Sequence, residues 1–175
     1  SDIKNYHSEE HSLSNGQVLM RNYSFDEALV IVREMTDNLV LDLFEKGLVT
    51  SSLTLWIAYD HRYEHEASKG TVKLERESNS SKKIIDAVED LYLRIADRYI
   101  GIRRIEVCAN RVAPESYVQY SLFDDPKQTD KERHLQEAVL NVKQRYGKNA
   151  IMRGSNLLEC STYRERNEQI GGHRA

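Results

Sequence analysis

The sequence predicts an α+β protein in which a four-stranded sheet carries two helices on one of its faces. Apolar residues alternate with polar ones in short segments, as in strands that are buried on one side. Two longer segments instead repeat apolar residues at helical spacing. The order along the chain is strand, helix, strand, strand, helix, strand. In its simplest packing both helices cover the same face, and a further helix and an extended tail follow the sheet.

The first strand and helix occupy the N-terminal quarter of the chain. A short strand is expected over residues 13–19. Ser24, with Glu27 three residues later, has the pattern of a capping box and predicts that a helix begins there. That helix should run to residue 46, because Gly47 is a typical stop. Its apolar face would be formed by Phe25, Leu29, Val32, Leu39 and Leu43.

The second half of the sheet is predicted from the same kinds of sequence pattern. Alternation predicts strands over residues 53–59 and 71–76, with a polar loop between them. Ser81 can cap a second helix that ends before Gly101, and a last strand covers residues 102–107. The side chains expected beneath the helices are Leu55, Ile57, Val72, Leu74, Ile105 and Val107. The opposite face would present Trp56, Lys73, Glu75, Arg104 and Glu106.

Pro114 marks the expected edge of this domain, which would span residues 1–114. Residues 115–128 would form a linker. A third helix is predicted over residues 129–147, with Thr129 and Glu132 as a capping box and Gly147 at its end. The polar residues 148–175 are expected to form an extended or disordered tail.

Composition indicates a soluble globular protein. Of the 175 residues, 39% are hydrophobic and 30% are charged. No segment approaches the ~20 apolar residues of a membrane span, and no signal-peptide core is present. Two distant cysteines favour a reduced, cytoplasmic setting without a membrane partner. The start at Ser1, without Met, fits an excised fragment.

The formal net charge of −3 is unevenly distributed. Residues 25–46 contain six acidic and two basic side chains, whereas residues 69–76 and 102–112 each contain three basic and one acidic. Acidic residues therefore concentrate on a helix and basic residues on strands. This asymmetry permits contact with nucleic acid on one face.

Residues 119–123 form a compact motif, Gln119-Tyr120-Ser121-Leu122-Phe123. Its two adjacent large apolar side chains stand among polar neighbours, and burying each would be worth roughly 1.5–3 kcal/mol. Gln119 offers a donor and an acceptor. The motif resembles the pentapeptide with which bacterial DNA polymerases and repair proteins bind the sliding clamp. The alternative is that both apolar side chains pack onto their own domain.

The surrounding residues resemble the C-terminal, little-finger region of the Y-family lesion-bypass DNA polymerases, of the ImpB/MucB/SamB type and its Gram-positive branch. The resemblance rests on the first strand over residues 12–19, the strand 102–107, the clamp motif and the helix that begins at 131–133 and ends at 144–147. It continues through residues 151–155 and 166–173.

This resemblance implies a non-catalytic, DNA-binding fragment of a polymerase that bypasses template damage in the SOS response. Its partners would be the primer–template duplex and the sliding clamp. The two Mg²⁺ ions of the parent enzyme would lie in a palm domain that this sequence does not match, so no cofactor is expected here. The DNA-binding residues implied are Ser12, Ser14, Gln17, Arg103 and Arg104, with Lys73 and Arg76 added by pattern.

Other readings of the sequence remain open. Asp124-Asp125 and the pair His61 and His65 could hold a metal, but both are better explained as solvated charges and a polar loop. The order of elements also fits a ferredoxin-like regulatory module or an RNA-binding module. An RNA-binding module stacks bases on aromatic residues of its two central strands. The segment expected to correspond, residues 70–74, contains no aromatic residue.

Overall fold

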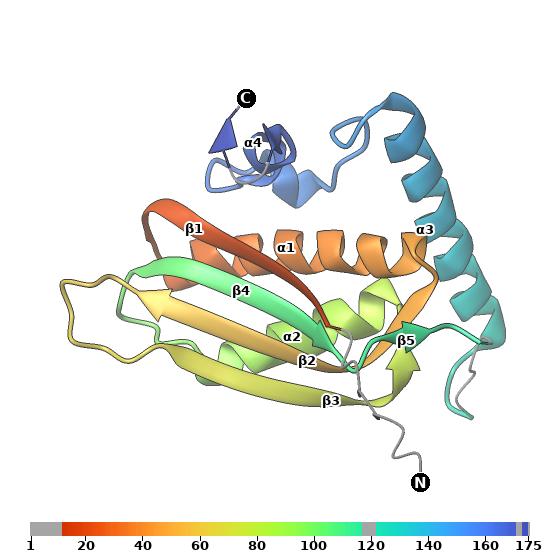
Figure 1. Ribbon diagram of the computed structural model, residues 1–175, viewed down its shortest axis with the longest axis horizontal. Coiled ribbons are helices and arrows are strands. Elements are labelled where there is room, and N and C mark those ends of the chain that lie inside the picture. The colour runs from red at the N-terminus through yellow and green to blue at the C-terminus, as the bar shows by residue number, and fades with distance from the viewer. Residues whose placement is uncertain (1–11, 117–121, 171–172, 175) are drawn as a thin grey trace, which may run out of the picture.

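A computed structural model describes residues 12–116, 122–170 and 173–174 and confirms the predicted α+β order (Figure 1). The strands pair antiparallel in the order β1-β4-β2-β3, so β1 and β3 are the edges. Figure 1 shows the first two helices, α1 and α2, on the same side of the sheet. The elements are β1 (Leu13–Tyr23), α1 (Phe25–Glu45), β2 (Leu48–Tyr59), β3 (Ser68–Ser78), α2 (Ser81–Ile95) and β4 (Ile102–Asn110).

The core lies between the sheet and the two helices, as the alternation of the strands predicts. Leu55 and Ile57 of β2 are fully buried, as are Ile105 and Val107 of β4. Val72 and Leu74 on the edge strand β3 pack against this core but are only partly buried. The amphipathic faces of α1 and α2 cover the sheet, with Ile31, Met35, Leu39, Leu43, Ile84, Val88 and Tyr92 among the buried side chains.

Local signals fix the helix ends. The capping box of α1 is confirmed, because Ser24 accepts from the amide of Glu27 and Glu27 accepts from the amide of Ser24. Gly47 follows the helix at a φ of 63°, in the left-handed region where glycine is favoured. The cap of α2 is Ser80, one residue before the predicted one, since its hydroxyl accepts from Lys83.

The chain does not leave the domain at Pro114. A short strand, β5 (Ala113–Pro114), pairs with the start of β2 and returns the chain to the sheet. The third helix, α3 (Pro126–Tyr146), begins three residues earlier than predicted. Asp125 caps it by accepting from the amide of Lys127, and Pro126 occupies the first helical turn, where proline costs no hydrogen bond.

The C-terminal segment is folded, which corrects the expectation of an extended or disordered tail over residues 148–175. It contains a 3₁₀ turn, η1 (Gly154–Leu157), a short helix, α4 (Tyr163–Asn167), and the two-residue strands β6 (Gln169–Ile170) and β7 (His173–Arg174). The buried carboxylate of Glu34 on α1 accepts from Asn156, from the hydroxyl of Ser161 and from the amide of Thr162. These polar residues therefore bind a buried acid on α1.

Candidate nucleic-acid interface

The face of the sheet away from the helices carries a basic and hydroxyl-rich hollow of about 610 Å³. Because side chains alternate along a strand, every second residue of the four strands points to this open face. The hollow is lined by Ser52, Thr54 and Trp56 of β2, Lys69 and Thr71 of β3, Arg104, Glu106, Cys108 and Asn110 of β4, and Arg111.

Arg104 lies on the open face, as predicted. Its guanidinium carbon is 5.1 Å from the centre of the Trp56 ring, and one of its nitrogens is 3.6 Å from a carboxylate oxygen of Glu106. The side chain of Arg104 is half exposed. The aromatic ring and the carboxylate orient the arginine, while much of its surface remains accessible to a ligand.

Arg103 occupies an irregular position of β4. The register with β2 pairs Ala58 with Arg104 and Tyr59 with Ile102, so Arg103 is an extra residue of a β-bulge. The pairing of β4 with β1 is interrupted at the same place. Bulges redirect side chains and are frequent near functional sites. The bulge lies at the start of the central strand β4, where Arg103 and Arg104 are consecutive in the chain.

The polar groups in the hollow form a short network between strands. The hydroxyls of Thr54 and Thr71 are 2.8 Å apart, and the amide nitrogen of Asn110 donates to Thr54 at 2.8 Å. Burial raises the pKa of the Cys108 thiol, so that thiol adds no negative charge near neutral pH. The network adds hydroxyl and amide groups to the hollow, which Lys69, Arg104 and Arg111 also line.

The remaining predicted DNA-binding residues lie on or beside the two edge strands, β1 and β3. Ser14 is exposed on the open face of β1, opposite Cys108, and Ser12 precedes that strand. Lys73 is exposed on β3, opposite Ser52, and Arg76 is exposed further along this edge. Gln17 is the exception, because its side chain binds Thr162 and Arg166 of the C-terminal segment. Gln17 therefore lies outside the open face.

Several residues of the hollow were missed by the sequence analysis. Lys69 precedes the predicted strand 71–76, but β3 begins at Ser68 and places it opposite Trp56. Arg111 follows β4 at a φ of 50°, a conformation that non-glycine residues rarely adopt. Period-two alternation could have identified Thr54 and Thr71, whereas nothing in the sequence indicates the backbone conformation at Arg111.

The structure describes only part of the predicted clamp motif. Gln119, Tyr120 and Ser121 lie outside the described residues. Leu122 and Phe123 precede α3, and their exposed fractions are 96% and 97%. Two adjacent apolar side chains with such exposure do not belong to the core of this domain. The alternative, in which both apolar side chains pack onto their own domain, therefore does not agree with the structure.

The other chemical candidates have structural roles. Asp124 pairs with Lys83 at 2.7 Å, and Asp125 caps α3. A ring nitrogen of His65 lies 3.2 Å from a carboxylate oxygen of Asp97, and the His65 and Tyr59 rings pack in a T-shaped arrangement with their centres 4.5 Å apart. Within the part of the chain that the structure describes, no three His, Cys, Asp or Glu residues are grouped as a metal site. None of the described helices is long and apolar enough to cross a membrane.

The RNA-binding alternative placed residues 70–74 in a central strand, and the structure corrects that placement. These residues belong to β3, which is an edge strand, whereas the central pair is β2 and β4. Trp56 is the aromatic residue that the described central strands present in the hollow, and Arg104 already lies over its ring.

Comparison with known proteins identifies the family to which this chain belongs. The model of the impB/mucB/samB family C-terminal domain matches residues 10–122. A relative, DNA polymerase IV 2 of Bacillus subtilis (strain 168), is 25% identical over 164 residues, which are 93% of this chain. This chain spans only 39% of that relative's length.

Solved structures with some similarity include a complex of the beta-clamp processivity factor with the little finger domain of PolIV. It has a TM-score of 0.45 and 12% identity, and the match covers 65% of this chain and all of the other. A post-insertion binary complex of Dbh DNA polymerase has a TM-score of 0.43 and 14% identity, with 60% of this chain and 30% of the other covered. The family model matches well over half of the present chain. The chain therefore belongs to the impB/mucB/samB family and carries its C-terminal domain.

Proposed function

We propose that the open face of the sheet binds the sugar–phosphate backbone of a DNA duplex and does not read its sequence. The observation that carries this proposal is the hollow itself, in which Lys69, Arg104 and Arg111 surround hydroxyl and amide groups. Arginine, lysine and hydroxyl side chains are typical phosphate ligands, and phosphate contacts position a protein without specifying bases. Such binding suits a polymerase that must accept any template.

This fragment would be a non-catalytic part of a cytoplasmic translesion polymerase that acts on damaged DNA in the SOS response. Template-directed synthesis needs carboxylates that converge on Mg²⁺, and these would be supplied by the palm domain of the whole protein. We expect the fragment alone, with Mg²⁺ or Mn²⁺ added, to incorporate no nucleotide in a primer-extension assay. Incorporation by a clean preparation would contradict this assignment.

The DNA proposal predicts a defined dependence on salt. If about four phosphates are neutralised, log affinity should fall against log salt with a slope of roughly −3 to −4. Replacing Arg103 and Arg104 with alanine should flatten the slope by about one unit for each lost contact. Fluorescence anisotropy with duplexes of unrelated sequence measures both quantities.

A matched control uses Arg94→Ala with Arg164→Ala, two exposed arginines of α2 and α4 that do not line the hollow. This control should leave the slope unchanged. A strong preference for one duplex sequence, or equal slopes in both double variants, would show that the open face does not bind the backbone.

We also propose that Leu122 and Phe123 anchor the chain to a bacterial sliding clamp, with Gln119, Tyr120 and Ser121 completing the motif. We expect micromolar affinity, about −8 kcal/mol. Phe123→Ala should cost about 2 kcal/mol or more, as at other binding hot spots. Gln119→Ala should cost about 1 kcal/mol, since hydrogen bonds to a neutral group are lost. Calorimetric titration with purified clamp measures these differences.

Tyr99→Ala is the matched control, because this aromatic side chain is 95% exposed and lies far from the motif in sequence. It should bind the clamp like the parent chain. Thermal melts of Phe123→Ala should match the parent because Phe123 is exposed. A large drop in melting temperature without detectable clamp binding would make the motif a structural segment instead.

A further inference from the structure

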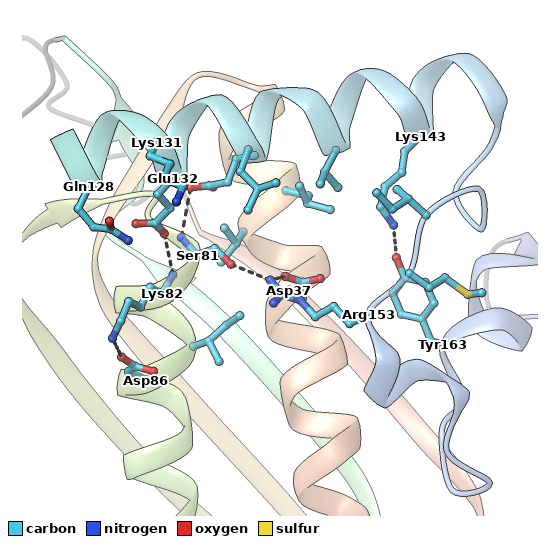
Figure 2. Close-up of a pocket in the computed structure, with 18 residues that line it drawn as sticks. Asp37, Ser81, Lys82, Asp86, Gln128, Lys131, Glu132, Lys143, Arg153 and Tyr163 are labelled. Carbon is cyan, nitrogen blue, oxygen red and sulfur yellow. Dashed lines mark hydrogen bonds and ion pairs between the residues drawn. The ribbon is translucent and has the colours of Figure 1, made fainter.

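A groove of about 550 Å³ lies beneath α3, where this helix crosses α1 and α2 (Figure 2). Its apolar lining includes Val40 of α1, Ile85 of α2, and Leu135 and Val139 of α3. Leu135 is 64% exposed. An apolar surface of this kind, with polar residues around it, is typical of a binding site for another macromolecule.

Hydrogen bonds to α2 hold the groove open at one end. Glu132 accepts from the hydroxyl of Ser80 at 2.8 Å and from the amide of Lys82 at 2.9 Å. Gln136, the buried residue of α3, donates to the carbonyl of Asn79 at 3.0 Å. These contacts fix α3 against the start of α2, so the groove exists before any ligand binds.

One stripe of α3 faces this groove at a spacing of four residues. It consists of Lys131, Leu135, Val139 and Lys143, which all line the groove. Residues four apart lie on the same side of a helix. At 1.5 Å per residue, the two lysines are separated by about 18 Å along the helix axis, roughly three turns. The stripe therefore places two apolar side chains between two cations.

The carboxylates around the groove are already engaged. Asp37 pairs with Arg153 at 2.7 Å, and Asp86 pairs with Lys82 at 2.8 Å. Glu132 accepts from the start of α2, as described above. Figure 2 shows Lys143 pointing to Tyr163, and Lys143 also donates to the carbonyl of Lys148 at 3.0 Å, so neither partner is a carboxylate.

Lys131 and Lys143 therefore carry the uncompensated charge of the groove. Among the described residues, neither lysine forms an ion pair with a carboxylate. An apolar centre with a cation at each end is complementary to an apolar segment with an acidic residue at each end.

We propose that this groove binds an acidic amphipathic helix of a partner protein. Two apolar side chains, four residues apart, would enter the groove, and acidic residues one turn before and after them would reach Lys131 and Lys143. Helices that bind in grooves use anchors at this spacing, and charges at the rim set orientation and association rate. This inference does not depend on DNA or clamp binding, since neither the residues of the open face nor Leu122 and Phe123 line the groove.

The test uses a fluorescein-labelled, alanine-based peptide containing Glu-Ala-Ala-Ala-Leu-Ala-Ala-Ala-Leu-Ala-Ala-Ala-Glu, and a second peptide in which both glutamates are replaced by lysine. Anisotropy should show saturable binding of the acidic peptide and at least about tenfold weaker binding of the basic one. Lys131→Glu with Lys143→Glu should reverse this preference. Leu135→Ala should weaken binding of both peptides.

Two controls keep the outcomes distinct. Lys127→Glu makes one such lysine-to-glutamate change, at an exposed residue of α3 that does not line the groove, and should bind the peptides like the parent. Thermal melts identify a variant that fails to fold, and Leu135→Ala then supplies the test without charge reversal. The lysine variants should retain DNA and clamp binding, so failure of this proposal is distinguishable from failure of those functions.

Equal binding of both peptides, or no saturable binding, would overturn the proposal. A concentration-dependent dimer in sedimentation experiments that the acidic peptide does not dissociate, and that Leu135→Ala abolishes, would assign the groove to a second copy of the chain and would also overturn it.

Discussion

Glu27 shows how one side chain connects a strand to the helix that follows it. Its carboxylate accepts from Arg21 of β1 at 2.7 and 3.1 Å and from the amide of Ser24 at 2.9 Å. The hydrogen bonds from the Arg21 guanidinium, followed by those from Ser24, lower the pKa of Glu27 from 4.5 to about 2. Glu27 therefore completes the cap of α1 and joins that helix to β1.

This lowered pKa predicts a specific pH dependence. A carboxyl group with a depressed folded-state pKa stabilises the fold above its unfolded pKa, and this contribution is lost as the pH falls through the folded pKa. The free energy of unfolding should therefore decrease from about pH 5 to about pH 2. Glu27→Gln should be less stable at pH 7 and show a smaller decrease. Urea melts across this range measure both curves.

Asp26→Asn is the matched control, since Asp26 is an exposed neighbour in the same helical turn. Its curve should follow that of the parent more closely than the curve of Glu27→Gln does. If Glu27→Gln and the parent remain separated by a constant free energy down to pH 2, the carboxylate is not the titrating group.

At the scale of elements, α3 supplies a cap to α2 from a distant part of the chain. The carboxylate of Glu132 accepts from Ser80 and from the amide of Lys82, while Gln136 contacts Asn79 and Ser81. The first amides of a helix lack partners within the helix, and a negative charge there is favourable. The third helix is therefore a structural part of the domain and not a separate unit joined by a linker.

Removal of this cap should destabilise the protein. Glu132→Ala is expected to lower the free energy of unfolding by about 1 kcal/mol, the usual cost of losing a helix cap. Glu137→Ala, an exposed change on the same helix, should have little effect. Denaturant melts compare the two variants. Equal effects of both would indicate that only helix propensity in α3 has changed.

At the scale of the whole molecule, the elements share the core unequally. The strands β2 and β4 and the helices α1 and α2 contribute most of the fully buried apolar side chains. In α3 the buried residue is Gln136, so this helix is held mainly by polar contacts. Regions with few buried apolar contacts open at lower free energy than the core.

We therefore expect α3 to open locally without unfolding of the sheet. Hydrogen exchange followed by mass spectrometry should show faster exchange in peptides from α3 than in peptides from β2 and β4. Protection of α3 equal to that of the central strands would mean that it belongs to the same cooperative unit.

Much of the fold could be predicted because its signals are local. Period-two alternation identified β2, β3 and β4 and assigned Leu55 and Ile105 to the core, and the capping box at Ser24 located the start of α1. The site was predicted less completely. Arg104 lies on the open face because of strand alternation. The bulge at Arg103, however, depends on the pairing of β4 with other strands, and the contacts of the Gln17 side chain depend on the C-terminal segment.

The sequence by itself determined the order and type of the main elements, the faces of β2, β3 and β4, and the motif at residues 119–123. Each of these depends on residues close together in the chain. Only the tertiary structure decided that β2 and β4 lie at the centre, that α3 caps α2, and that the C-terminal segment folds. The last depends on Glu34, whose buried carboxylate binds residues more than a hundred positions away. A polar segment is predicted to be disordered when its distant hydrogen-bond partner cannot be recognised from the sequence. Here the segment folds because the buried charge of Glu34 must be satisfied by hydrogen bonds.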